Sequence, residues 1–554
     1  MSARHPLERL QELVHIERED IGTLIAYGIG IGLMSLATPV AVQALVNTIA
    51  FGALMQPLVV LTLILLVLLS FSNTLVALQF YVVEMLQRRL FVRFFGEAAN
   101  RLQRVTLASR DQQYLPELAN RFFDVVTLQK SAATLLLETL GYILQTLIGM
   151  ILLAFYHPML LAFDLFLIAA LYFILFVMGR GAIPTVIEQS KAKYAAAAWL
   201  ENIAANPLLG KSQLGDDFIR HQTERVAKDY LGACVNHFRI LSRQNIGALA
   251  LHTLANTALL GMGGWMVIER QLSLGQLIAA ELVVNAMVYG LTRLGKTLDN
   301  YYELLASIDK ISYLLDLPQE IDKGAAPKPG TQPLKVEIKQ LCMLEGFQLD
   351  NIKNLDLELQ PGTRLALSHG ADRGTLLELL YGLRLPSAGR IRLDEQDLRD
   401  LSLGALRDQI ALVHQAEVMD AAIVDNVAAG RSLELSEIRA ALDKVGLLDE
   451  VSTLPDGLNT NLCAHGVPLS PEQCLRLTLA RAIAARPRLL LIDRLLDSID
   501  EQWLPRILQV LFDDAPWTLI VVSHDARVIE RCDRHAHIRN GGLQWVDKQT
   551  GEPA

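Results

Sequence analysis

The sequence contains few residues of the kinds that crosslink small secreted domains or bind metal ions. Only five of its 554 residues are cysteines, and no two of them have the Cys-x-x-Cys spacing of a metal or redox site. The five are Cys234, Cys342, Cys463, Cys474 and Cys532. Reduced cysteine packs as a small apolar side chain, and we interpret all five in that way. We therefore expect neither a disulfide framework nor a metal site.

Charged residues are also scarce, and positive charges are the minority. Asp, Glu, Lys and Arg make up 20% of the chain, against 52% hydrophobic residues, and the formal net charge is −9. General nucleic-acid binding needs a basic surface that neutralises phosphates, so we expect no nucleic-acid partner. Because the hydrophobic excess is concentrated in the first half of the chain, the composition predicts a membrane domain followed by a soluble one.

Long apolar runs are abundant in that first half. A helix that crosses a bilayer needs roughly 20 apolar residues. Six stretches meet this length: 21–47, 54–78, 135–155, 158–178, 246–268 and 274–291. Only Tyr156 and His157 separate the third stretch from the fourth, so these two should form an antiparallel pair.

The connections between these stretches differ in length and charge. The two long ones, 84–130 and 180–244, are rich in basic residues, among them Arg88, Arg89, Arg93, Arg101, Lys191, Lys193, Lys211 and Arg243. The short ones carry almost no positive charge. By the positive-inside rule, both termini and both long connections are cytoplasmic. The charged segment 1–20 does not have the pattern of a cleavable signal peptide. We expect an integral multi-pass protein in contact with membrane lipid, in a bacterial inner membrane.

Composition also suggests where the domains begin and end. Residues 318–333 are rich in Pro and Gly and have no apolar period, as in a linker. Residues 334–554 alternate strand-like and helical segments, which indicates an α/β domain. We predict a cytoplasmic N-terminal helix at 1–20, a six-helix membrane domain at 21–317, the linker, and an α/β domain at 334–554.

Three short segments of the second half occur in a recognisable order. They are Leu469-Ser470-Pro471-Glu472-Gln473, Leu490-Leu491-Ile492-Asp493-Arg494 and Val521-Val522-Ser523-His524. In order and spacing they resemble the signature, Walker B and switch-histidine motifs of ABC transporter ATPases. The fold that this resemblance implies is an α-helical six-helix exporter-type membrane domain followed by an α/β P-loop NTPase-like domain.

The membrane half resembles the exporter type of the same family, with six helices and two long cytoplasmic extensions. The phrase from Leu272 to Ala280 is similar to the haemolysin- and peptide-exporter branch. Many members of that branch carry an N-terminal peptidase or peptidase-like domain. Only about 20 residues precede the first predicted span here, so we expect no such domain.

The segment that corresponds to the P-loop departs from its pattern. A P-loop, G-x-x-x-x-G-K-[ST], cradles phosphates with backbone N–H groups, while its Lys reaches the β and γ oxygens and its hydroxyl holds Mg²⁺. Here residues 368–375 read Ser-His-Gly-Ala-Asp-Arg-Gly-Thr. If Arg373 takes the lysine position, Gly374 replaces the hydroxyl; if Thr375 is the hydroxyl, Gly374 replaces the lysine. We interpret the segment as a vestigial nucleotide site.

The Walker B and signature motifs are altered as well. Asp493 matches the aspartate that supports Mg²⁺ through water, but Arg494 stands where the family has its catalytic glutamate. In the signature, Ser470 and Gln473 remain, whereas Pro471 lacks an N–H and Glu472 brings a negative charge toward the γ-phosphate position. Efficient ATP hydrolysis in the chain's own site is therefore not expected.

Other positions of the family pattern are retained. Gln415 matches the Q-loop glutamine, His524 the switch histidine, and Ser498-Ile499-Asp500 the D-loop. Without the catalytic glutamate, we interpret His524 as a packing residue. The aromatic residue that stacks on adenine would fall near Leu344 or Glu345, and Phe347 is close by.

Two acidic residues lie inside the predicted spans. Asp164 belongs to the fourth span and Glu281 to the sixth. Charged groups in a membrane usually face the bundle interior or a cavity and mark a pathway. The alternative is a position near a helix end, or a protonated carboxyl paired with a neighbour, and the sequence does not decide between them.

Two functions are compatible with these features. The first is export of a peptide, protein or related substrate by a dimer, either a homodimer or a heterodimer with another ABC half-transporter. The haemolysin-type resemblance implies a periplasmic adaptor as a further partner. The second is a non-catalytic scaffold or regulator of a membrane assembly that another protein powers. The resemblance implies ATP and Mg²⁺ as cofactors, whereas the altered motifs argue against both, so enzymatic activity stays open at the level of sequence.

Overall fold

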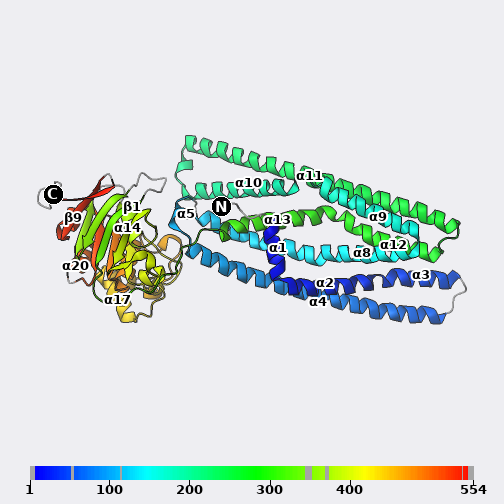
Figure 1. The fold of residues 1–554 in the computed structure, drawn as a ribbon, viewed down its shortest axis with the longest axis horizontal. Coiled ribbons are helices and arrows are strands. Elements are labelled where there is room, and N and C mark those ends of the chain that lie inside the picture. Colours follow the sequence, from blue (N-terminus) through cyan, green and yellow to red (C-terminus); the bar gives the residue numbers. More distant parts are fainter. Residues whose placement is uncertain are drawn as a thin grey trace. The chain divides into compact units, whose positions relative to one another are not determined.

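The computed structural model describes residues 6–50, 55–112, 115–343, 352–368, 373–513, 515–539 and 541–546. The chain forms two compact units, shown in Figure 1. Unit 1 comprises Met1–Arg104 and Gln113–Leu317, and unit 2 comprises Val105–Gln112 and Pro318–Ala554.

Helices are the only regular secondary structure among the described residues of unit 1. Its helices are α1 (Pro6–Ile16), α2 (Arg18–Ser35), α3 (Ala37–Ala50), α4 (Met55–Gln103), α6 (Leu115–Asn120), η1 (Arg121–Phe123), α7 (Asp124–Thr134), η2 (Leu135–Thr139), α8 (Leu140–Tyr156), α9 (Pro158–Tyr172), η3 (Phe173–Val177), α10 (Ala182–Ala205), η4 (Leu209–Lys211), α11 (Gln213–Ile268), α12 (Leu274–Thr292) and α13 (Leu294–Leu315).

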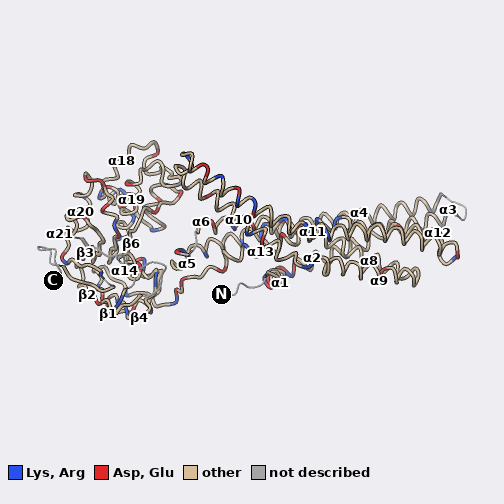
Figure 2. Tube along the Cα trace, turned by 90° about the horizontal axis from the view of Figure 1, so that it is seen from above, with Lys and Arg blue, Asp and Glu red and all other residues tan. Residues whose placement is uncertain are grey.

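Six helical segments of this unit are long and apolar enough to cross a membrane, so the predicted number of spans is confirmed. They are Arg18–Asn47, Leu58–Gln103, Leu115–Tyr156, Pro158–Val177, Gln213–Ile268 and Leu274–Leu315. Figure 2 shows Lys, Arg, Asp and Glu to be sparse along α3, α8, α9 and α12, and frequent along α10 and the adjoining part of α11. This distribution is the one that a lipid environment around the first group of helices requires.

The first span is not the single helix that its hydropathy predicts. It consists of α2 and α3, with Leu36 between them. Pro39 has no backbone N–H, so the carbonyl of Ser35 loses its helical donor at this point. One turn earlier, the Ser35 hydroxyl donates to the carbonyl of Gly32, 2.7 Å away. A proline inside an apolar run thus divides the helix without removing the span.

The third and fourth spans form the predicted antiparallel pair, which Figure 1 shows as α8 and α9. His157 alone joins them, in an extended conformation with φ −161° and ψ 144°. Its Nδ1 accepts a hydrogen bond from the backbone N–H of Met159, 3.2 Å away. Pro158 is the first residue of α9, a position where its missing N–H costs nothing. The side chain of His157 and the following proline therefore fix the turn.

Unit 2 is an α/β domain with two sheets. An antiparallel sheet has the order β2-β1-β4-β5, and a six-stranded sheet has the order β10-β9-β3-β8-β7-β6. The strands are β1 (Val336–Met343), β2 (Ile352–Leu359), β3 (Arg364–Ser368), β4 (Ala388–Leu393), β5 (Gln396–Asp397), β6 (Ile410–Val413), β7 (Leu489–Asp493), β8 (Thr518–Val522), β9 (Arg534–Arg539) and β10 (Gly542–Trp545).

The helices of unit 2 lie between these strands in the chain. They are α5 (Leu107–Gln112), α14 (Arg373–Leu380), η5 (Leu398–Asp400), α15 (Leu403–Arg407), α16 (Ile423–Ala428), α17 (Leu435–Lys444), α18 (Leu448–Ser452), η6 (Gly457–Asn459), η7 (Ala464–Gly466), α19 (Pro471–Ala484), η8 (Leu495–Ser498), α20 (Leu504–Phe512) and α21 (Ala526–Arg531).

The central strands of the six-stranded sheet are parallel and buried on both faces. Every residue of β7 and β8 is buried, and these strands are nearly continuous apolar runs, as parallel strands covered on two sides must be. Successive residues of β7 enter different cores. Leu490 and Ile492 pack with α17, α19 and α20, whereas Leu489 and Leu491 pack with α14 and the antiparallel sheet.

The segment after Leu317 runs along unit 2. The N–H of Ala325 donates to the carbonyl of Asp400, and the Asp322 carboxylate accepts from the N–H of Leu403, each over 2.8 Å. In the part of unit 2 that comes from residues 105–112, Asp111 binds Arg384 over 2.6 Å. These contacts tie both outlying segments to the α/β domain.

Candidate functional site

The parallel register of β6 and β7 builds the centre of the candidate nucleotide site. Val413 of β6 lies opposite Ile492 of β7, so the residues that follow, His414 and Asp493, emerge side by side. Nδ1 of His414 lies 2.7 Å from Oδ2 of Asp493. The hydrogen bond raises the pKa of His414, while partial burial of the imidazole opposes this shift. Asp493 itself is 3% exposed.

Arg494 follows Asp493 in a left-handed conformation, with φ 53°. A residue with a Cβ rarely adopts this conformation, which costs roughly 1–2 kcal/mol. Its backbone is fixed by an N–H donation to the carbonyl of Val522 over 2.9 Å. Its side chain is 59% exposed, and Nε lies 3.4 Å from Oδ1 of Asp493. Arg494 therefore places a cation next to the carboxylate of Asp493.

The P-loop segment is described only in part. Residues 369–372 lie outside the described residues, and α14 begins at Arg373. Gly374, in the first turn, lies against the Walker B position, because a Cβ built on it would stand 3.1 Å from Oδ2 of Asp493. Thr375, one residue further on, is half-buried. The structure thus brings Gly374 close to Asp493.

The residues that remain of the signature form the N-terminus of α19. The Ser470 hydroxyl accepts a hydrogen bond from the N–H of Gln473, and the Gln473 side chain accepts from the N–H of Ser470, over 3.1 and 2.7 Å. This is a capping box, with Pro471 at the first helical position. Both retained side chains are therefore used in starting the helix.

The charge of Glu472, expected near the γ-phosphate position, is paired with an arginine of the chain itself. Its carboxylate accepts from Nε of Arg476, one turn later, over 2.9 Å. Arg476 is 1% exposed, and its other nitrogens donate to Glu450 and to the carbonyl of Gly446. Its guanidinium also lies 4.8 Å from the ring centroid of Trp503. The negative charge of Glu472 is thus paired within α19.

The remaining predicted residues lie at the carboxyl ends of the same strands. Gln415 is exposed directly after His414. The backbone N–H of His524 donates to the Asp497 carboxylate over 3.3 Å, and the Ser523 hydroxyl donates to the same group. Leu344, Glu345 and Phe347, proposed around the adenine position, lie outside the described residues.

Three residues of this region have structural roles that sequence reasoning missed. They are His414, Asp497 and Arg476, which bind Asp493, Ser523 and Glu472 respectively. The i,i+4 spacing of Glu472 and Arg476 is a visible signal for the last pair. The other two contacts depend on strand register and loop conformation, for which the sequence contains no such signal.

The two membrane carboxylates lie in different environments. Asp164 of α9 is 3% exposed, and neither of its oxygens has a hydrogen-bond partner among the residues that the structure describes. Glu281 of α12 is exposed within this single chain. Asn285 and Tyr289, four and eight residues later, are exposed as well, whereas Val284 and Val288 are buried. One face of α12 is therefore polar and uncovered in the single chain.

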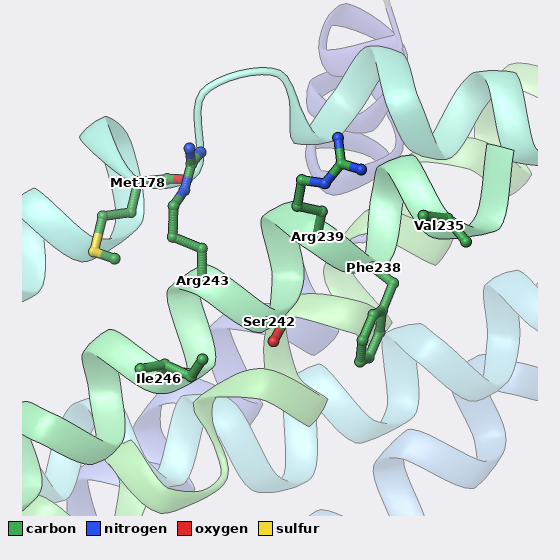
Figure 3. A pocket seen from close by; sticks show the side chains of 7 residues that line it. All are labelled: Met178, Val235, Phe238, Arg239, Ser242, Arg243 and Ile246. Carbon is green, nitrogen blue, oxygen red and sulfur yellow. The ribbon is translucent and has the colours of Figure 1, made fainter. Parts of the chain in front are cut away.

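A groove of about 490 Å³ lies between α11 and Met178, as Figure 3 shows. Its lining residues are Met178, Val235, Phe238, Arg239, Ser242, Arg243 and Ile246. Nε of Arg243 donates to the carbonyl of Met178 over 2.8 Å, which closes the end of the fourth span. The side chains of Phe238 and Ile246 are 66% and 63% exposed. The groove is thus an apolar surface with two arginines.

Two parts of the sequence match profiles of one protein family. Residues 21–290 match the profile of the ABC transporter transmembrane region, and residues 352–495 match that of the ABC transporter. The structure resembles that of a bacterial Atm1-family ABC exporter with ATP bound, with a TM-score of 0.83, 20% sequence identity and coverage of 96% of this chain and 95% of that one. This chain is an ABC exporter half-transporter. Its transmembrane domain is fused to an ABC ATPase domain, as the motifs and the six spans predict.

Two curated relatives that this chain resembles are named for different transported molecules. The mitochondrial iron-sulfur clusters transporter ATM1 of Kluyveromyces lactis is 26% identical over 338 residues, 59% of this chain and 47% of that protein. The ATP-dependent lipid A-core flippase of Chromobacterium violaceum is 33% identical over 245 residues, 43% of this chain and 42% of that protein. The chain thus matches about half of the length of these relatives or less. The ABC ATPase fold implies a domain of the kind that binds ATP with Mg²⁺.

Proposed function

We propose that the half-transporter is a component of an export system whose own ATPase domain does not hydrolyse ATP efficiently. The observation that carries this proposal is Arg494, which stands beside Asp493 at 3.4 Å where the family has its catalytic glutamate. Phosphoryl transfer relies on positioned charges, a residue that orients the attacking water and a lysine on the phosphates. Arg494 cannot orient the attacking water as a carboxylate does. The P-loop segment also has no lysine, whether Arg373 or Gly374 is aligned with the lysine position.

A dimer is part of this proposal, because a half-transporter has one set of six spans. The cytoplasmic part of α11 supports it. Val235 and Phe238 lie before the apolar stretch that begins at Ile246, yet they are 54% and 66% exposed. Apolar groups that face neither lipid nor a core usually mark a contact with another protein. We propose that a second half-transporter covers this part of α11.

The composition of the dimer decides which nucleotide sites are impaired. In the ABC family each site joins the Walker motifs of one subunit to the signature of the other. A homodimer would therefore combine the altered Walker motifs with the altered signature twice. In a heterodimer with an intact partner, that partner's Walker motifs would still meet Pro471 and Glu472 of this chain. The proposal therefore predicts weak turnover in both assemblies.

The substrate pathway, in this proposal, follows the polar face of α12. Glu281, Asn285 and Tyr289 are spaced by four residues, which places them on one side of a helix. Polar groups that face lipid are costly, so this side should face a cavity between subunits. The segment Leu272–Ala280 resembles the haemolysin- and peptide-exporter branch. This resemblance supports a peptide, a protein or a related molecule as substrate, with a periplasmic adaptor. The relatives named above are transporters of iron-sulfur clusters and of lipid A-core, and a lipid-like substrate would be the other outcome.

The proposal is tested by isolating the assembly from native membranes. Proteins that copurify with the tagged half-transporter are identified, and ATP turnover is measured with and without each of them. A second half-transporter in stoichiometric amount supports export by a dimer. A stable assembly that contains a non-ABC motor, with no second half-transporter, would instead show that the chain is a scaffold. Robust turnover by this chain alone would contradict the proposal.

A further inference from the structure

The carboxylate of Asp493 is enclosed by groups from three elements. Oδ2 lies 2.7 Å from Nδ1 of His414, at the end of β6, and 3.1 Å from the Cβ position of Gly374, in α14. Oδ1 lies 3.4 Å from Nε of Arg494, at the end of β7. With 3% of Asp493 exposed, little of the carboxylate is left for other ligands. Oδ2 thus faces the imidazole, whereas Oδ1 lies within ion-pair distance of Arg494 but accepts no hydrogen bond among the described residues.

Mg²⁺ makes different demands on this position. It binds six oxygens in near-ideal octahedral geometry and keeps several of its waters. A Walker B aspartate supports such an ion through one of these waters, so its carboxylate must face an open, hydrated space. Here an imidazole N–H and a guanidinium face it. The Arg494 cation also repels a divalent ion at this distance.

The described part of the P-loop segment supplies no compensating ligand next to Asp493. The Cβ position of Gly374 stands 3.1 Å from Oδ2 of Asp493, and glycine has no hydroxyl. Thr375 has one, but it lies one residue further along α14 and is half-buried. The described residues therefore do not fit Mg²⁺, in contrast to what the ABC ATPase fold implies. This mismatch concerns ion binding and is separate from the loss of the catalytic glutamate.

We propose that His414 and Arg494 hold Asp493 in place of Mg²⁺, so that this half-transporter takes up no divalent cation at its Walker B position. The inference rests on the proposed function and deepens it. His414 serves in this role in both protonation states, since a neutral imidazole with its proton on Nδ1 also donates to a carboxylate. Any nucleotide response of this domain is then the same with and without Mg²⁺.

The test uses the full-length protein in lipid nanodiscs, with Mn²⁺ as a spectroscopic probe for Mg²⁺. Free and bound Mn²⁺ are separated by electron paramagnetic resonance, in the presence of ATP, for the wild-type protein and for Asp493→Asn. We expect the two proteins to bind Mn²⁺ equally. Mn²⁺ bound at least tenfold more tightly by the wild-type protein than by Asp493→Asn would overturn the inference.

A second measurement tests the cause. In thermal unfolding, the shift in midpoint that ATP produces should be the same in EDTA and in Mg²⁺ for the wild-type protein, a shift of zero included. A shift seen only with Mg²⁺ would overturn the inference. The hydrogen bond itself is tested by His414→Phe and Asp493→Asn, which should together lower the midpoint by less than the sum of their separate losses. Additive losses would show that the two side chains are not coupled.

A matched control separates general loss of structure from loss of this contact. Arg486 has a left-handed φ of 49° and an exposed side chain, as Arg494 has, but lies on another loop. Arg486→Gly should leave Mn²⁺ binding and the ATP response unchanged. ATP turnover, measured on the same samples, keeps the two proposals apart. Turnover without Mn²⁺ binding at Asp493 would contradict only the proposed function, and Mn²⁺ binding at Asp493 without turnover would contradict only the present inference.

Discussion

Arg476 binds Glu472, which lies one turn earlier in α19, with Nε 2.9 Å from the carboxylate. The same guanidinium binds Glu450 at 2.9 and 3.0 Å. Arg476 is 1% exposed, so its guanidinium is removed from water, while the side chains of Glu472 and Glu450 are 15% and 28% exposed. Burying an ion pair costs desolvation energy, which only complete pairing offsets. The altered signature segment is therefore one end of an internal charge network.

Breaking this network should destabilise the ATPase domain. Arg476→Met leaves two carboxylates without their cation, and removing one partner of a buried pair costs about 3–5 kcal/mol. The free energy of unfolding of unit 2 is measured by denaturant titration of the full-length protein. Arg486→Met provides the control, because Arg486 pairs with Glu437 at the surface and its side chain is 79% exposed. We expect a change within about 1 kcal/mol there. Equal losses in the two variants would refute the buried network.

The purified half-transporter should hydrolyse ATP no faster than an unrelated membrane protein prepared in the same way. Arg494 replaces the residue that orients water, and the P-loop lacks its lysine. Phosphate release is measured with Mg²⁺ and ATP in nanodiscs. Turnover that is well above this background and disappears in Asp493→Asn would show that the site is catalytically intact.

Restoring one carboxylate should not restore activity. Arg494→Glu supplies the missing group, but a base acts only on a triphosphate that is already held in line. Positioning contributes about 7–11 kcal/mol to such reactions, and the P-loop pattern here has lost its lysine. Turnover of Arg494→Glu is compared with that of the wild-type protein, with each candidate partner present. Substantial Mg²⁺-dependent turnover by the single variant alone would mean that this chain lost one residue rather than its mechanism.

Asp164 should be a site where stability and activity diverge. Its carboxyl is buried in α9 without a hydrogen-bond partner among the described residues. Leaving a buried polar group unpaired costs about 1–3 kcal/mol, so Asp164→Leu should raise the thermal midpoint of the isolated protein. If Asp164 serves the pathway, the same variant should lose transport. A lowered midpoint would contradict the description of Asp164 as a buried carboxyl without a partner.

The membrane topology is tested by labelling single cysteines. In a variant whose five native cysteines are replaced by serine, Gln56→Cys should react with a membrane-impermeant reagent from the periplasm. Gly330→Cys should react only after the membrane is permeabilised. Both long connections and both termini are cytoplasmic in this arrangement. Labelling of Gly330→Cys in intact cells would show that the topology is the opposite.

Hydropathy and motif order predicted the architecture because both are local properties of the sequence. Six apolar stretches suffice to give six spans, and Asp493 is recognisable from the strand that precedes it. The division of the first span at Leu36 was not predicted, although Pro39 provides the signal. Apolar composition gives the length of a membrane segment, whereas a single missing N–H decides whether it is one helix or two.

The contacts inside the candidate site were not predictable in the same way. His414 meets Asp493 only because β6 and β7 pair with Val413 opposite Ile492, and strand register is a tertiary property. Glu472 was expected to repel phosphate, and its pairing with Arg476 depends on burial as well as on helical spacing. Charges are easily read from a sequence, but their partners depend on the fold.

The capping box of α19 explains how two residues of the signature segment can be retained without a bound nucleotide. Ser470 and Gln473 hydrogen-bond to each other's backbone N–H groups, and this contact requires no phosphate. The need for a properly started helix is enough to retain these two residues, whether or not the site turns over ATP. Pro471 suits the first position of a helix in the same way. The presence of Ser470 and Gln473 is therefore evidence for the start of a helix and is not, by itself, evidence for a working nucleotide site.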